Sequence, residues 1–64
     1  MEAYKVIARR TEQTGISVSE LARRTGLNYF LLRLSLRGER RLLADELVAL
    51  CKEFDLEMSD FDAA

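Results

Sequence analysis

The 64-residue sequence predicts a compact all-α domain of four to five short helices. It contains no proline and is rich in Leu, Ala, Arg and Glu, which are good helix formers. Three glycines, Gly15, Gly26 and Gly38, lie eleven and twelve residues apart, a spacing that suits short helices separated by tight turns. We therefore expect one domain over residues 1–64, without strands, repeats or linkers.

The first two helices are predicted from apolar spacing and from residues that begin or end helices. A helix over residues 2–14 would bury one stripe of side chains, formed by Tyr4, Ile7, Ala8 and Thr11. Gly15 suits the left-handed residue that ends it. A second helix is predicted over residues 18–25 and is closed by Gly26. Ser17 and Glu20 form a capping box, in which the Ser17 hydroxyl accepts from a backbone N–H and Glu20 reaches back.

The third helix is predicted to follow the N-cap residue Asn28 and to reach Arg37, with Gly38 as its stop. Two short helices joined by a tight glycine turn describe a helix-turn-helix over residues 17–37. A fourth helix is predicted over residues 44–54, with one apolar face formed by Leu47, Leu50, Cys51 and Phe54. We expect Ser59 to cap a final short turn that packs Phe61 against the core.

The residue types argue against several classes of protein. Cys51 is the only cysteine and histidine is absent, so an internal disulfide is excluded and neither a structural zinc site nor a nucleophile–base pair is expected. No apolar run approaches the roughly 20 residues of a membrane span, and no signal segment opens the chain. We expect a cytoplasmic protein that is not an enzyme, with no cofactor, metal, membrane partner or small-molecule substrate.

The net charge of −1 hides a strong asymmetry along the chain. Residues 23–41 hold six arginines against one glutamate, a local net charge of +5, whereas residues 42–64 hold seven acids against one lysine, a local net charge of −6. A basic segment of this kind is typical of phosphate binding. The alternative is that these are ordinary solvated helix faces balanced by the acidic end of the chain.

Three stretches, GISVSELARRTGLN, LRGERR and ADELVALCKEFDLEMSDF, follow one another and cover nearly the whole chain. In this order they resemble the lambda-repressor-like, or XRE-type, helix-turn-helix family of bacterial and phage regulators. The resemblance implies five helices and DNA as the partner, with the third helix in the major groove. It also implies phosphates near Ser17, the second helix and the RGERR loop, and often two-fold dimers on palindromic operators.

The resemblance implies that one face of the third helix points toward the bases. That face is formed by Tyr29, Phe30, Arg33, Leu34 and Arg37. Helical arithmetic independently places Phe30, Leu34 and Arg37 opposite an inward side of Leu32, Ser35 and Leu36. Arginine side chains are expected either at phosphates or at guanine edges. The candidate DNA-binding residues are Ser17, Arg24, Asn28, Tyr29, Arg33, Arg37, Arg40 and Arg41, of which Arg33 and Arg37 are the candidates for base edges.

This base-facing side of the third helix differs from the family pattern because it is apolar. Phe30 and Leu34 cannot form hydrogen bonds with base edges, and Leu43 stands where the family commonly offers a Ser or Thr cap. A second hypothesis is therefore a homodimer through the third helix, whose interface residues are Tyr29, Phe30, Leu31, Arg33, Leu34, Arg37 and Leu43. A regulator scaffold engineered to carry apolar surface residues would show the same pattern. A third alternative rotates the helix and places these leucines in the core.

Overall fold

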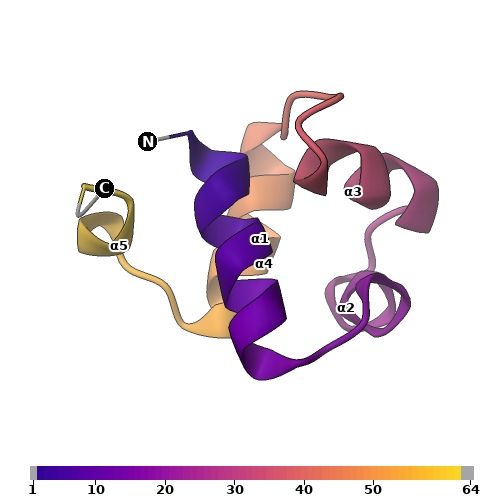
Figure 1. The fold of residues 1–64 in the computed structure, drawn as a ribbon, viewed down its shortest axis with the longest axis horizontal. Coiled ribbons are helices and arrows are strands. Elements are labelled where there is room, and N and C mark those ends of the chain that lie inside the picture. Colours follow the sequence, from indigo (N-terminus) through magenta and orange to yellow (C-terminus); the bar gives the residue numbers. More distant parts are fainter. Residues whose placement is uncertain (1, 63–64) are drawn as a thin grey trace.

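The computed structural model describes residues 2–62 and consists of five helices joined by short turns (Figure 1). These are α1 (Ala3–Thr14), α2 (Val18–Thr25), α3 (Tyr29–Leu36), α4 (Ala44–Phe54) and α5 (Met58–Asp62). In Figure 1, α2 and α3 lie to one side of α1, and α5 lies on its other side. The predicted all-α fold is confirmed, and no strand occurs among the described residues.

The ends of the first three helices follow the predicted signals. Gly15 and Gly26 take left-handed conformations, with φ of 76° and 75°. The hydroxyl of Ser17 accepts from the N–H of Glu20 at 3.1 Å, and the Asn28 carbonyl oxygen accepts from the N–H of Leu31 at 3.1 Å. These two bonds satisfy backbone donors that a helix start leaves unpaired. They also fix where the α2–turn–α3 unit begins each of its helices.

Half of the predicted capping box is wrong. The carboxylate of Glu20 does not reach back to the start of α2 but binds the guanidinium groups of Arg23 and Arg24. Two cationic donors lie one turn further along the same helix face and occupy both carboxylate oxygens of Glu20. Ser17 therefore caps α2 alone.

The end of α3 and the start of α5 differ slightly from the prediction. Helix α3 ends at Leu36 and Arg37 is its C-cap, while Gly38 follows with φ of 79° and the Glu39 N–H donates to the Leu34 carbonyl at 2.9 Å. The Ser59 cap is wrong, because α5 already begins at Met58. There, the side chain of Asp60 accepts from the N–H of Glu57 at 2.7 Å.

The core takes its buried apolar side chains from the first four helices: Ile7, Leu21, Ala22, Leu32 and Leu50. Around it pack partly buried residues that include Leu27, Leu36, Phe54 and, as predicted, Phe61. In α1, Ile7 and Thr11 are buried and Tyr4 and Ala8 are half-buried, whereas the burial of Val6 was not predicted. The rotated alternative for α3 is wrong, since Leu32 and Ser35 fill the inward side and Phe30 is 70% exposed.

Candidate nucleic-acid interface

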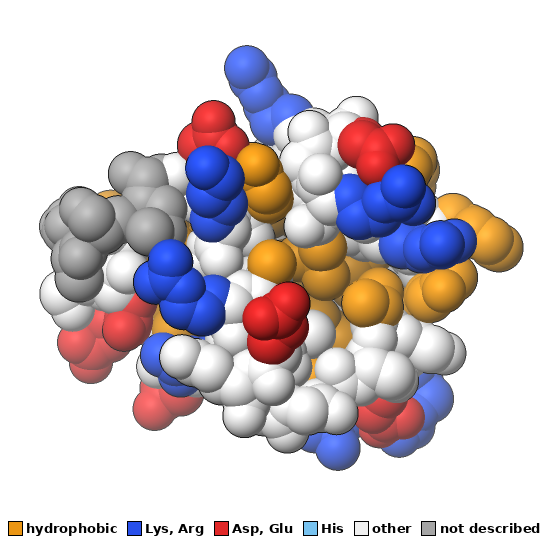
Figure 2. Space-filling view, viewed as in Figure 1, with side chains coloured by type: hydrophobic (Ala, Val, Ile, Leu, Met, Phe, Trp, Pro, Cys, Tyr) orange, Lys and Arg blue, Asp and Glu red, His pale blue; other side chains and the backbone are white. Residues whose placement is uncertain are grey.

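Helix α3 presents a face that combines apolar and basic side chains. Phe30, Arg33, Leu34 and Arg37 are all exposed, on the side opposite the buried Leu32 and Ser35. Figure 2 shows hydrophobic and basic side chains gathered together along the edge of the molecule where α3 lies. The outward orientation derived from helical arithmetic is therefore confirmed for these four residues.

Several exposed apolar side chains lie on and beside α3. Phe30 is 70% exposed and Leu43, at the start of α4, is 52% exposed, while Tyr29, Leu31 and Leu34 are exposed to a smaller extent. The rings of Tyr29 and Phe30 meet edge to face, with centroids 5.2 Å apart. Two aromatic side chains thus meet at the exposed start of the helix.

A network of polar side chains ties the loop after α3 to the start of α4. The guanidinium of Arg40 donates to the buried Ser35 hydroxyl at 2.9 Å and to both carboxylate oxygens of Glu46 at 3.0 and 3.1 Å. Glu46 also accepts from the N–H of Leu43 at 2.9 Å, and the Glu46 N–H, which a leucine side chain cannot cap, donates to the Asp45 carboxylate at 3.0 Å. The hydrogen bond from Arg40 is the main cause that lowers the pKa of Glu46, against the opposing effect of burial.

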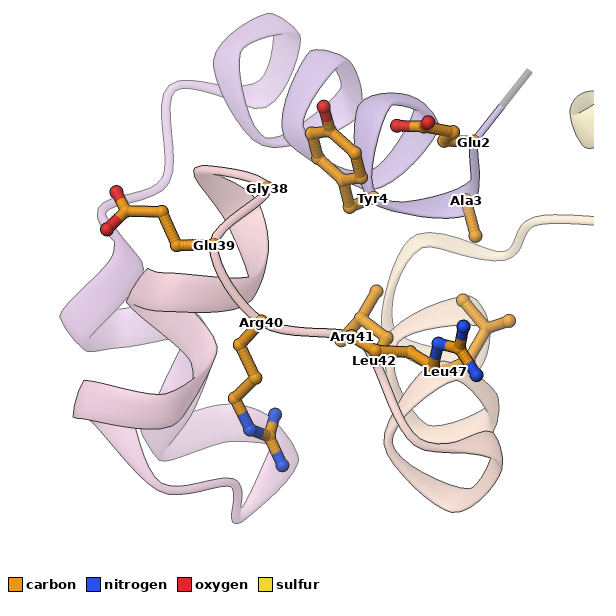
Figure 3. A pocket seen from close by; sticks show the side chains of 9 residues that line it. All are labelled: Glu2, Ala3, Tyr4, Gly38, Glu39, Arg40, Arg41, Leu42 and Leu47. Atoms are coloured by element: carbon orange, nitrogen blue, oxygen red, sulfur yellow. The ribbon is translucent and has the colours of Figure 1, made fainter.

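Figure 3 shows how the loop passes from α3 toward α4 with its side chains on different sides. The ring of Tyr4 lies close to Gly38, so that a β-carbon at Gly38 would come within 2.8 Å of it. Arg40 points to the other side of the loop, and the Arg41 side chain extends toward Leu47 (Figure 3). The loop is thus held by α1 on one side and by the Arg40 network on the other.

The arginines predicted to contact DNA differ in how far they are already paired. The recorded ion pairs within residues 2–62 do not involve Arg33 or Arg41, both of which are exposed. Arg37 pairs with Glu39, with 2.8 Å between Nε and Oε2, in an exposed pair that water screens. Arg33, Arg37 and Arg41 are therefore the cations most readily offered to a phosphate or a base.

Arg24 has a different environment on α2. Its Nε lies 3.0 Å from Glu20 and its Nη1 lies 3.5 Å from Glu53 of α4, so it bridges two helices while its side chain stays half exposed. Hydrogen bonds from Arg23 and Arg24 lower the pKa of Glu20. Ser17 and Asn28 are also exposed, and each uses its side-chain oxygen as the N-cap of a helix.

Sequence reasoning missed Ser35 and Glu46 as members of the site. Ser35 was expected only to face inward, and Glu46 was not selected. Glu46 is the third residue of α4, at the capping-box position. This signal could have been read from the sequence. The contact with Arg40 could not, because it depends on how the loop returns to α3.

Residues 7–61 match the family model of the Cro/C1-type HTH DNA-binding domain, where HTH denotes helix-turn-helix. The chain belongs to this family. The match extends from α1 to α5 and includes α2 and α3, which are the two helices of the motif. The predicted resemblance to lambda-repressor-like regulators is therefore confirmed. No match was found among curated proteins or among solved structures.

Two further observations concern the part of the chain that the structure describes. None of its helices is long and apolar enough to cross a lipid bilayer. No group of three or more Cys, Asp or Glu side chains in it is arranged to hold a metal ion.

Proposed function

We propose that this Cro/C1-type domain is a transcription regulator that binds duplex DNA with α3 in the major groove. The observation that carries the proposal is the match of residues 7–61 to a family of DNA-binding domains. The exposed basic face of α3 supports it, because a cationic surface of helical shape suits the major groove and its flanking phosphates. Arg33 and Arg37 are assigned to base edges, and Arg41 is assigned to a phosphate.

The other candidate residues receive smaller or indirect roles. Arg24 can approach a phosphate while Glu20 and Glu53 hold its orientation. Ser17 and Asn28 position the N-termini of α2 and α3, whose N–H groups favour anions. We assign Arg40 to positioning the loop rather than to a phosphate, because it is bound to Ser35 and Glu46 and only 22% of its side chain is exposed. This assignment differs from the sequence prediction.

The apolar residues limit what such a domain can read. Phe30 and Leu34 are able to contact thymine methyl groups but offer no hydrogen-bond donor or acceptor. Few base edges are then read directly, and most of the binding free energy comes from phosphates. We expect strong salt dependence and modest discrimination between sequences.

The test selects binding duplexes from a random pool and measures their affinity by fluorescence anisotropy at several salt concentrations, including about 150 mM. Arg33→Ala should relax specificity by about 1–3 kcal/mol at one base pair, and Arg41→Ala should lower the salt slope by about 1 at all sequences. Lys5→Ala, on α1, is the matched control that removes an exposed positive charge outside α3. Equal losses in all three variants, or no binding at about 150 mM salt, would contradict the proposal.

The exposure of Phe30 and Leu34 favours a second candidate function, a homodimer in which the α3 helices of two copies pack together. Tyr29 and Leu31 would extend the apolar centre, and Leu43, Arg33 and Arg37 would form its margin. This interface would cover the surface that reads DNA. Sedimentation at micromolar concentration tests it: the wild type should be a dimer and Leu34→Glu a monomer, and a monomeric wild type rules it out.

A further inference from the structure

A second apolar surface lies far from α3, between α4, α5 and the start of α1. It is a groove whose lining includes Val48, Cys51, Leu56, Met58 and Phe61. Met58 is 80% exposed and Val48 is 54% exposed, so this surface is open to solvent in the isolated chain. We call it the α4–α5 groove. Exposed apolar surfaces of this kind mark interaction sites more often than scattered single side chains do.

The rim of the α4–α5 groove is acidic. Asp55 and Glu57 both line it, together with one cation, Lys52. Neither carboxylate takes part in an ion pair recorded within residues 2–62. Apart from Ala3, the groove lining belongs to residues 42–64, which hold seven acids against one lysine. It therefore suits an occupant that combines apolar side chains with positive charge.

Helix α3 of this same chain has that composition. Phe30 and Leu34 are exposed one helical turn apart, and Arg33 lies beside them without an ion-pair partner among the described residues. An amphipathic helix that places side chains at i and i+4 into an apolar groove is a common mode of recognition. The two surfaces are complementary both in apolar character and in charge.

The charges also decide between two ways of assembling copies. Packing α3 against a second α3 would bring the arginines of two basic helices together, and like charges at an interface disfavour it. Packing α3 into the α4–α5 groove places arginines beside Asp55 and Glu57 instead. Figure 1 shows α3 and α5 on opposite sides of α1, so one copy can use both surfaces at the same time.

We propose that the α3 helix of one copy binds in the α4–α5 groove of the next, so that copies associate head to tail. Phe30 and Leu34 enter the groove beside Val48 and Met58, and Arg33 faces its acidic rim. Such an interface does not close on itself in a pair, because each pair leaves one α3 and one groove unoccupied. The assemblies therefore lengthen as the concentration rises. This inference does not rest on DNA binding and is measured without DNA.

The experiment uses sedimentation velocity on the wild type, on Leu34→Glu, which alters α3, and on Val48→Glu, which alters the groove. The average mass of the wild type should rise with concentration to more than twice the 7.4 kDa of one chain. Each variant alone should remain monomeric. An equimolar mixture of the two variants should form a heterodimer, because Val48→Glu supplies an intact α3 and Leu34→Glu supplies an intact groove.

Several results would overturn the inference. They are a wild type that stays monomeric up to roughly 1 mM, a Val48→Glu variant that associates like the wild type, and a mixture that stays monomeric. A dimer through two α3 helices would give the second of these results. Gln13→Glu, which adds the same charge at an exposed position of α1, is the control and should associate normally. Should Val48→Glu fail to fold by circular dichroism, Met58→Glu at the more exposed position replaces it.

Discussion

Replacing Gly38 by alanine is a sharp test of how the loop after α3 is held. Gly38 has φ of 79°, in the left-handed region, and a β-carbon there would lie 2.8 Å from both the Cζ and the Oη atoms of Tyr4. Gly26 provides the matched comparison, since its φ is 75° and no atom lies within 4 Å of the corresponding position. The two substitutions share the backbone strain and differ in the contact with Tyr4.

The expected costs follow from this difference. Placing an L-residue in the left-handed conformation costs about 1–2 kcal/mol, which applies to both glycines. Overpacking adds about 1–3 kcal/mol at Gly38 alone, and less if the Tyr4 ring turns aside. A domain of this length has a free energy of unfolding of about 3–10 kcal/mol. We therefore expect both variants to fold, with Gly38→Ala less stable than Gly26→Ala by up to about 3 kcal/mol.

Urea denaturation followed by circular dichroism measures both free energies, in the wild-type background and with Tyr4→Ala. The extra cost of Gly38→Ala should disappear when the ring is removed, because only the backbone strain then remains. In thermal denaturation each 1 kcal/mol corresponds to a fall in Tm of about 4–8 °C. Equal costs for the two glycine variants, or an extra cost that persists in Tyr4→Ala, would refute the reasoning.

Three further predictions concern caps and pH. Leu43→Ser should raise the free energy of unfolding by only about 0.5 kcal/mol, because Leu43 is an N-cap of α4 without a side-chain acceptor but the Asp45 carboxylate already accepts from the Glu46 N–H at 3.0 Å; an unchanged urea midpoint would contradict this. Asn28→Ala should lower it by about 1 kcal/mol, since its side chain accepts from the Leu31 N–H at 3.1 Å, and this is measured by the same titration. Arg40 lowers the pKa of Glu46 in the folded state. The pair therefore contributes to the free energy of unfolding above the ordinary glutamate pKa, and this contribution is lost as the pH falls through the lowered pKa. Glu46→Gln should flatten the acid side of the stability–pH curve.

Local signals explain why the sequence predicts most of the helix boundaries. Helices α2 and α4 have the predicted bounds, Val18–Thr25 and Ala44–Phe54. Their ends are determined by contacts between residues that are close in the chain, such as the hydrogen bond from the Glu20 N–H to the Ser17 hydroxyl. The start of α5 was predicted less well, because Asp60 rather than Ser59 supplies the side-chain acceptor for its first turn.

Contacts between helices explain what the sequence does not predict. Periodicity alone identified which side chains of α3 are exposed, since one buried face determines the other. It could not pair Arg24 with Glu53, which lies 29 residues further along the chain, nor Arg40 with both Ser35 and Glu46. The α4–α5 groove was missed for the same reason. Its walls come from both ends of the chain and meet only after folding.

One copy cannot use α3 for DNA binding and for head-to-tail association at the same time. The two binding equilibria are therefore linked by mass action. Duplex DNA would bind only copies whose α3 is free, so head-to-tail association lowers the concentration of competent copies as the total concentration rises. Leu34→Glu cannot separate the two uses, because Leu34 belongs to both surfaces. Val48→Glu can, since Val48 lies in the groove and away from α3. At high protein concentration this variant should bind DNA more tightly than the wild type, whereas at low concentration the two affinities should be equal. A difference that persists on dilution would mean that Val48 acts on DNA binding by a route other than assembly.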